Sequence, residues 1–312
     1  MSEKKTEQQE TPRYGIGEWY GRPLINITGV DRRRLAGETG SRKVTELCPF
    51  RQSSTPGATC NKKGGVCTLQ SYERKSDGGV TPSARTADLV TVCPSRFWEG
   101  NVVFKAIGKA LLDCARPTIV KEVGFLESFE EMSDRGVRNN CVVLVNSDSR
   151  NFDWCVAEMH ASHFSGDSMA TEPTMLENSM RKMRLPMWRQ PSDLFGYGTN
   201  RLMSKLQIMV PTLRRWGKKT AVVLDKPVFN ALGNIRPERD LSNADIAWFV
   251  VSYAGNDARL AIVETHFTTL ERSVEALTIS QAASCRQVED EIRTCLSNKG
   301  RATPGTVILL SY

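Results

Sequence analysis

The sequence of 312 residues has no run of about 18 consecutive apolar residues, the length that a membrane-spanning helix needs. The N-terminal segment MSEKKTEQQETPRYG also lacks the apolar core that a signal peptide requires. We therefore expect a soluble, cytoplasmic protein that does not associate with membranes.

Histidine is scarce, with 3 residues, whereas the chain has 9 cysteines. Without a secretory signal, a disulfide framework is not expected, because the cytosol keeps thiols reduced. A second metal site of histidine and cysteine is not expected either, since His163 and His160 are predicted on opposite strand faces and His266 is far along the chain. Metal ligation is the better interpretation of those cysteines that cluster.

Acidic residues are nearly absent between residues 181 and 219, where ten basic residues face one acid, Asp193. Such a segment attracts polyanions, and Lys and Arg gain free energy from counterion release at phosphates. Nucleic acid is the first partner to consider, although a solvated helix face that happens to be basic is an equally good explanation. The DNA-binding candidates are Arg181, Lys182, Arg184, Arg189, Arg201 and Lys205.

Composition divides the chain into three parts. Residues 1–13 are polar and aperiodic, which predicts a disordered tail. Residues 14–96 are rich in Gly, Ser, Thr and Pro, so this segment needs something besides apolar burial to hold it together. Residues 97–312 predict an α/β domain, a mixed sheet flanked by helices.

Apolar periodicity predicts the elements of this larger domain. Within the expected helix over Asn200 to Trp216, Pro211 indicates a kink or a break. The other expected elements are a helix from Phe97, a hairpin of strands 141–146 and 152–164, a strand over 220–224, a hairpin of strands 247–253 and 259–265, and two terminal helices.

Four cysteines fall inside the segment 14–96, namely Cys48, Cys60, Cys67 and Cys93, separated by 11, 6 and 25 residues. Neighbouring glycines and prolines favour the tight turns that metal ligands occupy. Four thiolates favour tetrahedral zinc or iron, and the ligand type does not separate the two. The alternative is four ordinary buried cysteines, because no tight Cys-x-x-Cys pair is present. The other five are predicted to be core residues: Cys114, Cys141, Cys155, Cys285 and Cys295.

A strand-like segment, Phe152 to His160, carries the candidate catalytic residues. Alternation along a strand puts Glu158 and His160 on one face and Asp153 on the other. A carboxylate two residues before a water-orienting group suits metal-dependent phosphodiester hydrolysis, in which Mg²⁺ activates water and neutralises charge on the phosphate. A solvated strand edge is the alternative interpretation of an isolated Glu-x-His.

These motifs, taken in order, resemble the NotI-type restriction endonucleases of the PD-(D/E)XK nuclease class. The resemblance covers most of the chain. It rests on Cys48-Pro49-Phe50, Gly65-Val66-Cys67, Val92-Cys93-Pro94, Phe152-Asp153-Trp154, Glu158-x-His160 with Phe164-Ser165-Gly166, Asp245 to Val250, and Thr265 to Leu277.

The resemblance implies a restriction-endonuclease-like fold with a small N-terminal four-cysteine metal domain. It implies a structural iron on Cys48, Cys60, Cys67 and Cys93, and a homodimer that cuts double-stranded DNA at a palindromic site with Mg²⁺. Asp153 and Glu158 are then the Mg²⁺ ligands, with His160 as the third catalytic residue.

Two departures from the family bear on activity. The class has Glu-x-Lys and NotI-type enzymes have Glu-x-Gln, whereas this chain has His160, which can orient water or act as a base. Only four residues separate Asp153 from Glu158, so Asp153 needs a bulge to reach the metal, or Asp148 or Asp134 replaces it. A sequence-specific DNA-binding protein that does not cleave, and an iron-sensing or redox regulator, are therefore the alternative functions.

Overall fold

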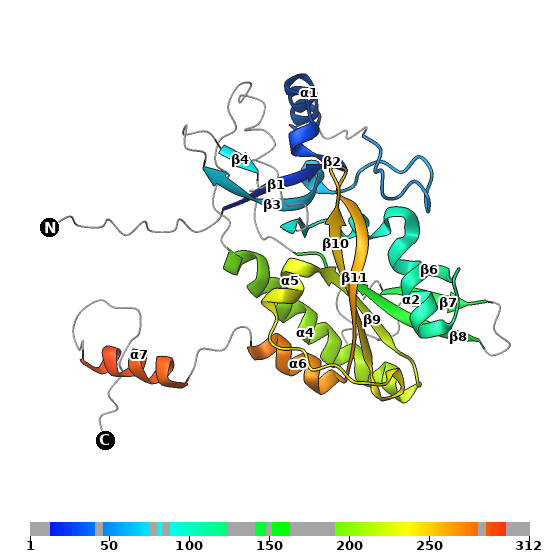
Figure 1. Cartoon of the computed structure of the whole chain (residues 1–312), viewed down its shortest axis with the longest axis vertical. Helices are drawn as coiled ribbons and strands as arrows, with labels where there is room; N and C mark the ends of the chain where they lie inside the picture. Colours follow the sequence, from blue (N-terminus) through cyan, green and yellow to red (C-terminus); the bar gives the residue numbers. More distant parts are fainter. Residues whose placement is uncertain are drawn as a thin grey trace, which may run out of the picture.

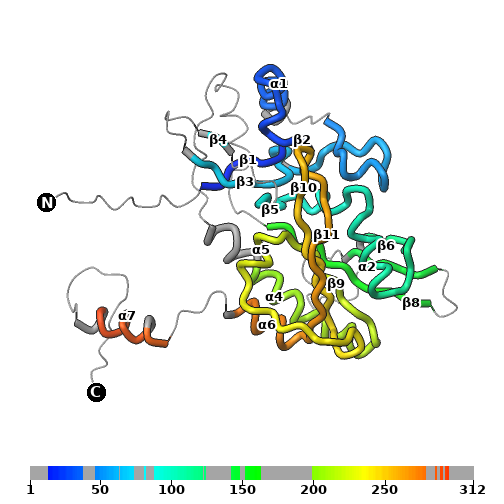
Figure 2. The backbone as a smooth tube through the Cα atoms, in the orientation of Figure 1, coloured from blue at the N-terminus to red at the C-terminus, as the bar shows by residue number. Residues whose placement is uncertain are grey.

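The computed structural model describes residues 13–40, 46–74, 80–82, 88–123, 141–147, 152–162, 191–279 and 285–297. This part of the chain contains two sheets with helices packed around them (Figure 1). Figure 2 follows the backbone from the N-terminal sheet, in blue and cyan, to the larger sheet, in green to orange.

The larger sheet has six strands in the order β11-β10-β9-β8-β7-β6. Pairing is parallel between β8 and β9 and between β9 and β10, and antiparallel elsewhere, so the sheet is mixed. The strands are β6 (Thr118–Val123), β7 (Cys141–Asn146), β8 (Asp153–Met159), β9 (Thr220–Asp225), β10 (Ile246–Ala254) and β11 (Arg259–Thr268).

Helices cover both faces of this sheet. β9 is buried along its whole length, and its side chains alternate between two clusters. Val222 and Leu224 join the cluster that contains α4 (Pro191–Arg215) and α6 (Leu270–Ile279), while Ala221 and Val223 join the cluster of α2 (Val102–Leu112). The remaining helices are η4 (Pro94–Asn101), α5 (Lys226–Ala231), η5 (Leu241–Asn243) and α7 (Cys285–Ser297).

The smaller sheet has the order β2-β1-β3-β4, with β5 also paired to β3. A register shift interrupts the β1–β3 pairing between Ile16 and Trp19. The elements are β1 (Arg13–Trp19), β2 (Arg22–Pro23), η1 (Leu24–Asn26), α1 (Gly29–Gly40), η2 (Lys63–Gly65), β3 (Val66–Arg74), β4 (Val80–Pro82) and β5 (Val90–Thr91).

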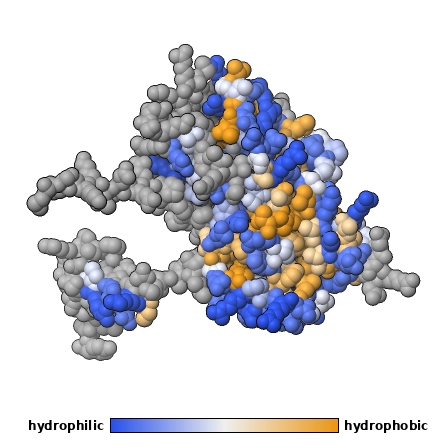
Figure 3. Space-filling view, in the orientation of Figure 1, coloured by the Kyte–Doolittle hydropathy of each residue, from blue (hydrophilic) through white to orange (hydrophobic). Residues whose placement is uncertain are grey.

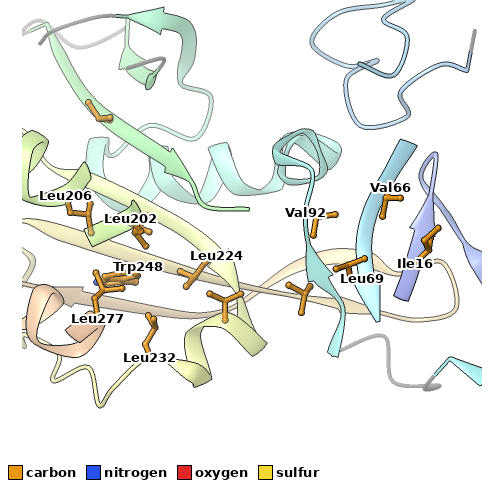
Figure 4. Packing of buried hydrophobic residues seen from close by; sticks show 14 of the residues in the cluster. Ile16, Val66, Leu69, Val92, Leu202, Leu206, Leu224, Leu232, Trp248 and Leu277 are labelled. Atoms are coloured by element: carbon orange, nitrogen blue, oxygen red, sulfur yellow. The ribbon is translucent and has the colours of Figure 1, made fainter. Parts of the chain in front are cut away.

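One hydrophobic cluster joins the two sheets. Ile16 and Leu69 of the smaller sheet belong to the same cluster as Trp248 of the larger sheet and Leu206 of α4, which covers that sheet (Figure 4). The described residues on either side of position 96 therefore share a core, and the boundary between 14–96 and 97–312 stays a prediction.

Buried polar contacts join the same two parts of the chain. Arg96 is fully buried, and its guanidinium donates to Glu18 of β1 and to Glu99 over 2.8 and 2.6 Å. Asp225 at the end of β9 accepts hydrogen bonds from the amide and hydroxyl of Thr91 on β5, at 2.5 and 2.7 Å. Because a buried charge is stable only with partners, these contacts fix how the two sheets meet.

The surface of the larger sheet has an apolar region. Figure 3 shows hydrophobic side chains gathered over β10 and β11 on the face in view, bordered by hydrophilic ones. Val263 on β11 is 45% exposed. Among the described residues, no helix has both the length and the apolar character to cross a membrane.

The predicted α/β architecture is confirmed, as are both hairpins, the 220–224 strand and the two terminal helices. The predicted helix from Phe97 is correct from Val102, while Phe97 itself lies in η4. The 200–216 helix begins earlier, at Pro191, and it continues through Pro211 to Arg215. Residues 1–12 lie outside the described residues.

Candidate active site

Glu158 and His160 lie at the end of β8 where the chain leaves the sheet. Glu158 pairs in register with Val222 of β9, and the His160 amide extends the pairing by donating to the Val223 carbonyl over 2.8 Å. Alternation puts both side chains on the face that α4 covers, because Val156, two residues before Glu158, packs in the α4 cluster. The predicted shared face is therefore present.

Helix α4 supplies two cations to this end of β8. The ammonium of Lys205 forms an ion pair with the Glu158 carboxylate, and both side chains are partly buried. Arg201, one helical turn before Lys205, lies near enough for its charge to act on His160. Arg201 is exposed to solvent, and the side chain of Lys205 is 24% exposed.

His160 is 8% exposed. Burial, with smaller effects from the positive charges of Arg201 and Lys205, lowers the pKa of His160 to about 4. The imidazole is therefore neutral at neutral pH, and it can orient a water molecule by hydrogen bonding without contributing a positive charge.

Asp153 lies at the other end of β8, and the structure does not bring it to Glu158. Asp153 pairs in register with Asn146, and its carboxylate accepts from the Lys218 ammonium over 2.6 Å. Five residues of extended strand place it about 16 Å from Glu158. The continuous β7–β8 register contains no bulge, so one magnesium ion shared by Asp153 and Glu158 does not fit this geometry.

The motif that suggested Asp153 has a structural role at this far end. The rings of Trp154 and Trp216 are 6.2 Å apart, and the Lys218 ammonium lies 5.6 Å from the Trp154 ring centre. The aspartate therefore belongs to a surface cluster that joins β8 to the end of α4.

The basic segment is only partly available for DNA. Four of its cations contact other parts of the protein, as Lys205 does with Glu158 and Arg214 does with Asp245 and Glu271. The other two are Lys218, bound to Asp153, and Lys219, which donates to the carbonyls of Ser242 and Ala244. Arg181, Lys182, Arg184 and Arg189 lie outside the described residues, as do His163, Asp134 and Asp148.

The four clustered cysteines come from separate segments that meet beside the smaller sheet. Cys48 and Cys67 pack together with Phe50, and the Cys93 amide donates to the Cys67 carbonyl over 3.2 Å. Cys60 is held near Cys48, since the side chain of Gln52 donates to the carbonyls of Cys48 and Ala58. This arrangement is consistent with the prediction from the sequence that the four cysteines lie close together.

Burial raises the pKa of the thiols of Cys60, Cys67 and Cys93, and charge on neighbouring cysteines raises each further. The Gly21 amide donates to Cys67 Sγ over 3.3 Å. Among the described residues, no three His, Cys, Asp or Glu side chains already stand in a metal-binding arrangement. The donor set fits a thiophilic cation, whose charge would reverse the repulsion between thiolates.

Outside this cluster, Cys114 and Cys155 are buried as predicted, whereas Cys285 is exposed on α7. The core prediction for Cys285 is therefore wrong, because the apolar spacing of α7 is not matched by packing against the sheets. The side chains of Cys141 and Cys295 lie outside the described set.

A family model, described as restriction endonuclease NotI, matches residues 31–261, which is most of the chain. The chain belongs to the NotI restriction endonuclease family. As a member, it is a site-specific deoxyribonuclease, a hydrolase that acts on DNA. No curated protein matches the chain.

Within this NotI family member, the match includes the four clustered cysteines, β8 and the whole of α4. The ion pair between Lys205 and Glu158 was not foreseen from the sequence, because 47 residues separate the partners. The sequence feature that pointed toward this ion pair was the local excess of basic residues, and that excess does not indicate which basic residue contacts β8.

Proposed function

We propose that this chain cuts both strands of DNA at a specific sequence with Mg²⁺, at a site of the PD-(D/E)XK class centred on Glu158. The observation that carries the proposal is the end of β8, where a partly buried carboxylate, a buried neutral imidazole and two cations of α4 meet. Family membership supplies the reaction type.

The residues at this end fit a hard cation. Mg²⁺ prefers oxygen ligands, carboxylate oxygens among them, and Glu158 offers a carboxylate near the end of β8. The chemistry that Mg²⁺ supplies when bound is water activation and neutralisation of charge on the phosphate. His160 orients the attacking water, and Arg201 binds a phosphate of the DNA backbone.

The alternatives to Asp153 as the second acidic ligand are Asp134 and Asp148, which both lie outside the described residues. Val142 of β7 pairs with Ala157, next to Glu158, whereas Asn146 at the other end of β7 pairs with Asp153. Asp134 precedes β7 in the sequence and Asp148 follows it, so chain order favours Asp134 as the second acid. Asp153 has no part in this proposal.

Cys48, Cys60, Cys67 and Cys93 would hold one structural metal ion, iron by the resemblance, with zinc equally suited to four thiolates. Support comes from the burial of Cys48, Cys67 and Cys93, the partial burial of Cys60, and the electrostatic effects of these cysteines on one another. The metal would fix the loop before β3 and the segment that runs through β5. The carbonyl of Thr91 on β5 accepts from the Ser162 amide, two residues after His160, over 2.8 Å.

A homodimer is the assembly that this function requires. One Glu158 site cuts one strand, and a symmetric cut in both strands of a palindrome needs two sites related by a two-fold axis. Sedimentation of the protein with a short duplex should give two chains per duplex, and a monomer that still makes double-strand breaks in one binding event would contradict this assembly.

The test uses plasmid and bacteriophage DNA with wild type and a Glu158→Ala variant, each with Mg²⁺ and with a chelator. The proposal predicts discrete fragments from wild type with Mg²⁺ alone. Intact DNA under conditions where wild type still shifts a duplex on a gel would favour the alternative, a DNA-binding protein that does not cleave.

A further inference from the structure

The strand that carries Glu158 supplies no permanent cation near it. The residue two positions later is His160, which is buried, and the residue between them is Met159. Hydrolysis of a phosphodiester builds negative charge on the phosphate oxygens, and a fixed positive charge aimed at them lowers the barrier. If Glu158 binds the metal as proposed above, that charge has to come from another element.

Helix α4 brings an ammonium to the required place. Lys205 contacts the Glu158 carboxylate directly, and its side chain is 24% exposed. Leu202 and Leu206, on either side of Lys205 in the helix, are buried against the sheet. The backbone that carries Lys205 is therefore held firmly, while its side chain extends along the sheet to the end of β8.

The Lys205 pair differs from the other lysine–carboxylate pair on this strand. Lys218 pairs with Asp153 at the opposite end of β8, beside two tryptophans, and Asp153 is 44% exposed. Glu158 is only 16% exposed, and His160, two residues later, lies near enough to Arg201 for the charge of Arg201 to act on it. A lysine at the Glu158 end lies beside the groups to which the proposed function assigns phosphate binding and hydrolysis, whereas one at the Asp153 end lies beside an exposed aromatic cluster.

We propose that Lys205 is a catalytic residue that contacts the scissile phosphate from helix α4 and supplies the positive charge that β8 lacks. This inference rests on the proposed function. In the reaction, the water oxygen bonds to phosphorus as one ester P–O bond breaks, the water gives up a proton, and the leaving oxygen takes one up. Lys205 stays protonated throughout, and it moves from Glu158 to a phosphate oxygen when DNA binds.

Two other roles for Lys205 predict different results. A lysine that only neutralises Glu158 before metal binding would affect folding stability and metal affinity, but not the rate on bound DNA. A lysine that only binds DNA would affect affinity and its salt dependence, because each phosphate contact releases counterions.

The experiment measures single-turnover cleavage with enzyme and Mg²⁺ in excess, and DNA affinity separately with Ca²⁺ in place of Mg²⁺. Wild type is compared with Lys205→Met, Lys205→Arg and the matched control Lys218→Met. We expect Lys205→Met to lower the cleavage rate about 100-fold or more. Lys205→Arg should keep part of the rate, and Lys218→Met should cut as wild type does, with DNA affinity nearly unchanged in all three.

If Lys205→Met does not fold, Lys205→Gln replaces it, since its side chain keeps a polar end. Wild-type cleavage rates in Lys205→Met or Lys205→Gln, or a loss explained entirely by weaker DNA binding, would overturn the inference while leaving Glu158 in place. A wild type that does not cut, or a Glu158→Ala variant that does, would overturn the proposed function itself and the role of Lys205 with it.

Discussion

The ammonium of Lys205 on α4 pairs with the carboxylate of Glu158 on β8, at the same end of the strand as the buried His160. Asp153, five residues earlier, pairs with Lys218 at the opposite end. One strand therefore presents two separate lysine–carboxylate pairs, and among the described residues only the Glu158 pair adjoins a histidine. Cleavage is assigned to the Glu158 end for this reason.

The second acidic ligand can be tested with Asp134→Asn and Asp148→Asn. The start of β7 lies at the Glu158 end of the sheet, so an acid that precedes β7 is favoured over one that follows it. We expect Asp134→Asn to lower the Mg²⁺-dependent cleavage rate about 100-fold or more, because a metal ligand is lost, and Asp148→Asn to cut normally. The opposite pattern would move the second ligand to the loop after β7.

The strands of the larger sheet could be predicted because buried strands appear in the sequence as short runs of apolar residues. Residues 141–146 and 220–224 are continuous apolar runs, typical of strands covered on both faces. The smaller sheet was not predicted as a sheet, because β1 contains glycines and the charged residue Glu18. That carboxylate is buried only because Arg96, 78 residues away, binds it.

The sequence predicted which side chains of β8 share a face of the sheet, but it did not predict which end of the strand forms the site. Alternation correctly places Glu158 and His160 together, since it depends on neighbouring residues alone. It does not say which end of a strand meets a partner helix, and Asp153 was therefore assigned to a site about 16 Å away. Lys205 reaches Glu158 through the packing of α4, which is tertiary information.

The four-cysteine cluster predicts a measurable metal content. Wild type should carry about one iron or zinc ion per chain, and Cys60→Ser should lose it, because three thiolates bind a tetrahedral metal far less tightly than four. Cys155→Ser is the matched control, since Cys155 is buried in the main core. Elemental analysis and thermal unfolding of the three proteins provide the measurement. Metal retained in Cys60→Ser, with an unchanged Tm, would exclude this ligand set.

Asp225 predicts a pH-dependent component of folding stability. Burial raises the pKa of Asp225 to about 7 from an unfolded value near 3.8, although Thr91 and Tyr253 donate hydrogen bonds to it. Because the folded state holds the proton more tightly, Asp225 adds stability at low pH, and this contribution is lost as pH rises from 3.8 through 7.

Asp225→Asn should remove this pH-dependent component. Urea unfolding at several pH values would give the difference in unfolding free energy between wild type and variant. We expect wild type to lose stability relative to Asp225→Asn by a few kcal/mol across this window, at about 1.4 kcal/mol per pH unit of pKa shift. A difference that does not change with pH would show that Asp225 titrates normally.

Gly65 and Gly57, both near the cysteine cluster, allow the cost of a positive φ to be compared with and without a steric clash. Both have positive φ, at 68° and 77°, but a Cβ at Gly65 would lie 2.3 Å from the Tyr20 ring, whereas a Cβ at Gly57 meets nothing. Gly57→Ala should cost about 1 kcal/mol of unfolding free energy, and Gly65→Ala clearly more. Equal losses in Tm for the two variants would contradict the close packing of Tyr20 on Gly65.

The most direct test compares Glu158→Gln with Asp153→Asn, two isosteric changes at opposite ends of one strand. Each removes a carboxylate that a lysine neutralises, so any general effect of the lost ion pair is common to both. Single-turnover cleavage of a duplex with the recognition site, at saturating enzyme and Mg²⁺, is the measurement. We predict that Glu158→Gln loses cleavage and Asp153→Asn keeps the wild-type rate. Loss of cleavage in Asp153→Asn with activity retained in Glu158→Gln would place the active site at the other end of β8 and contradict the central claim.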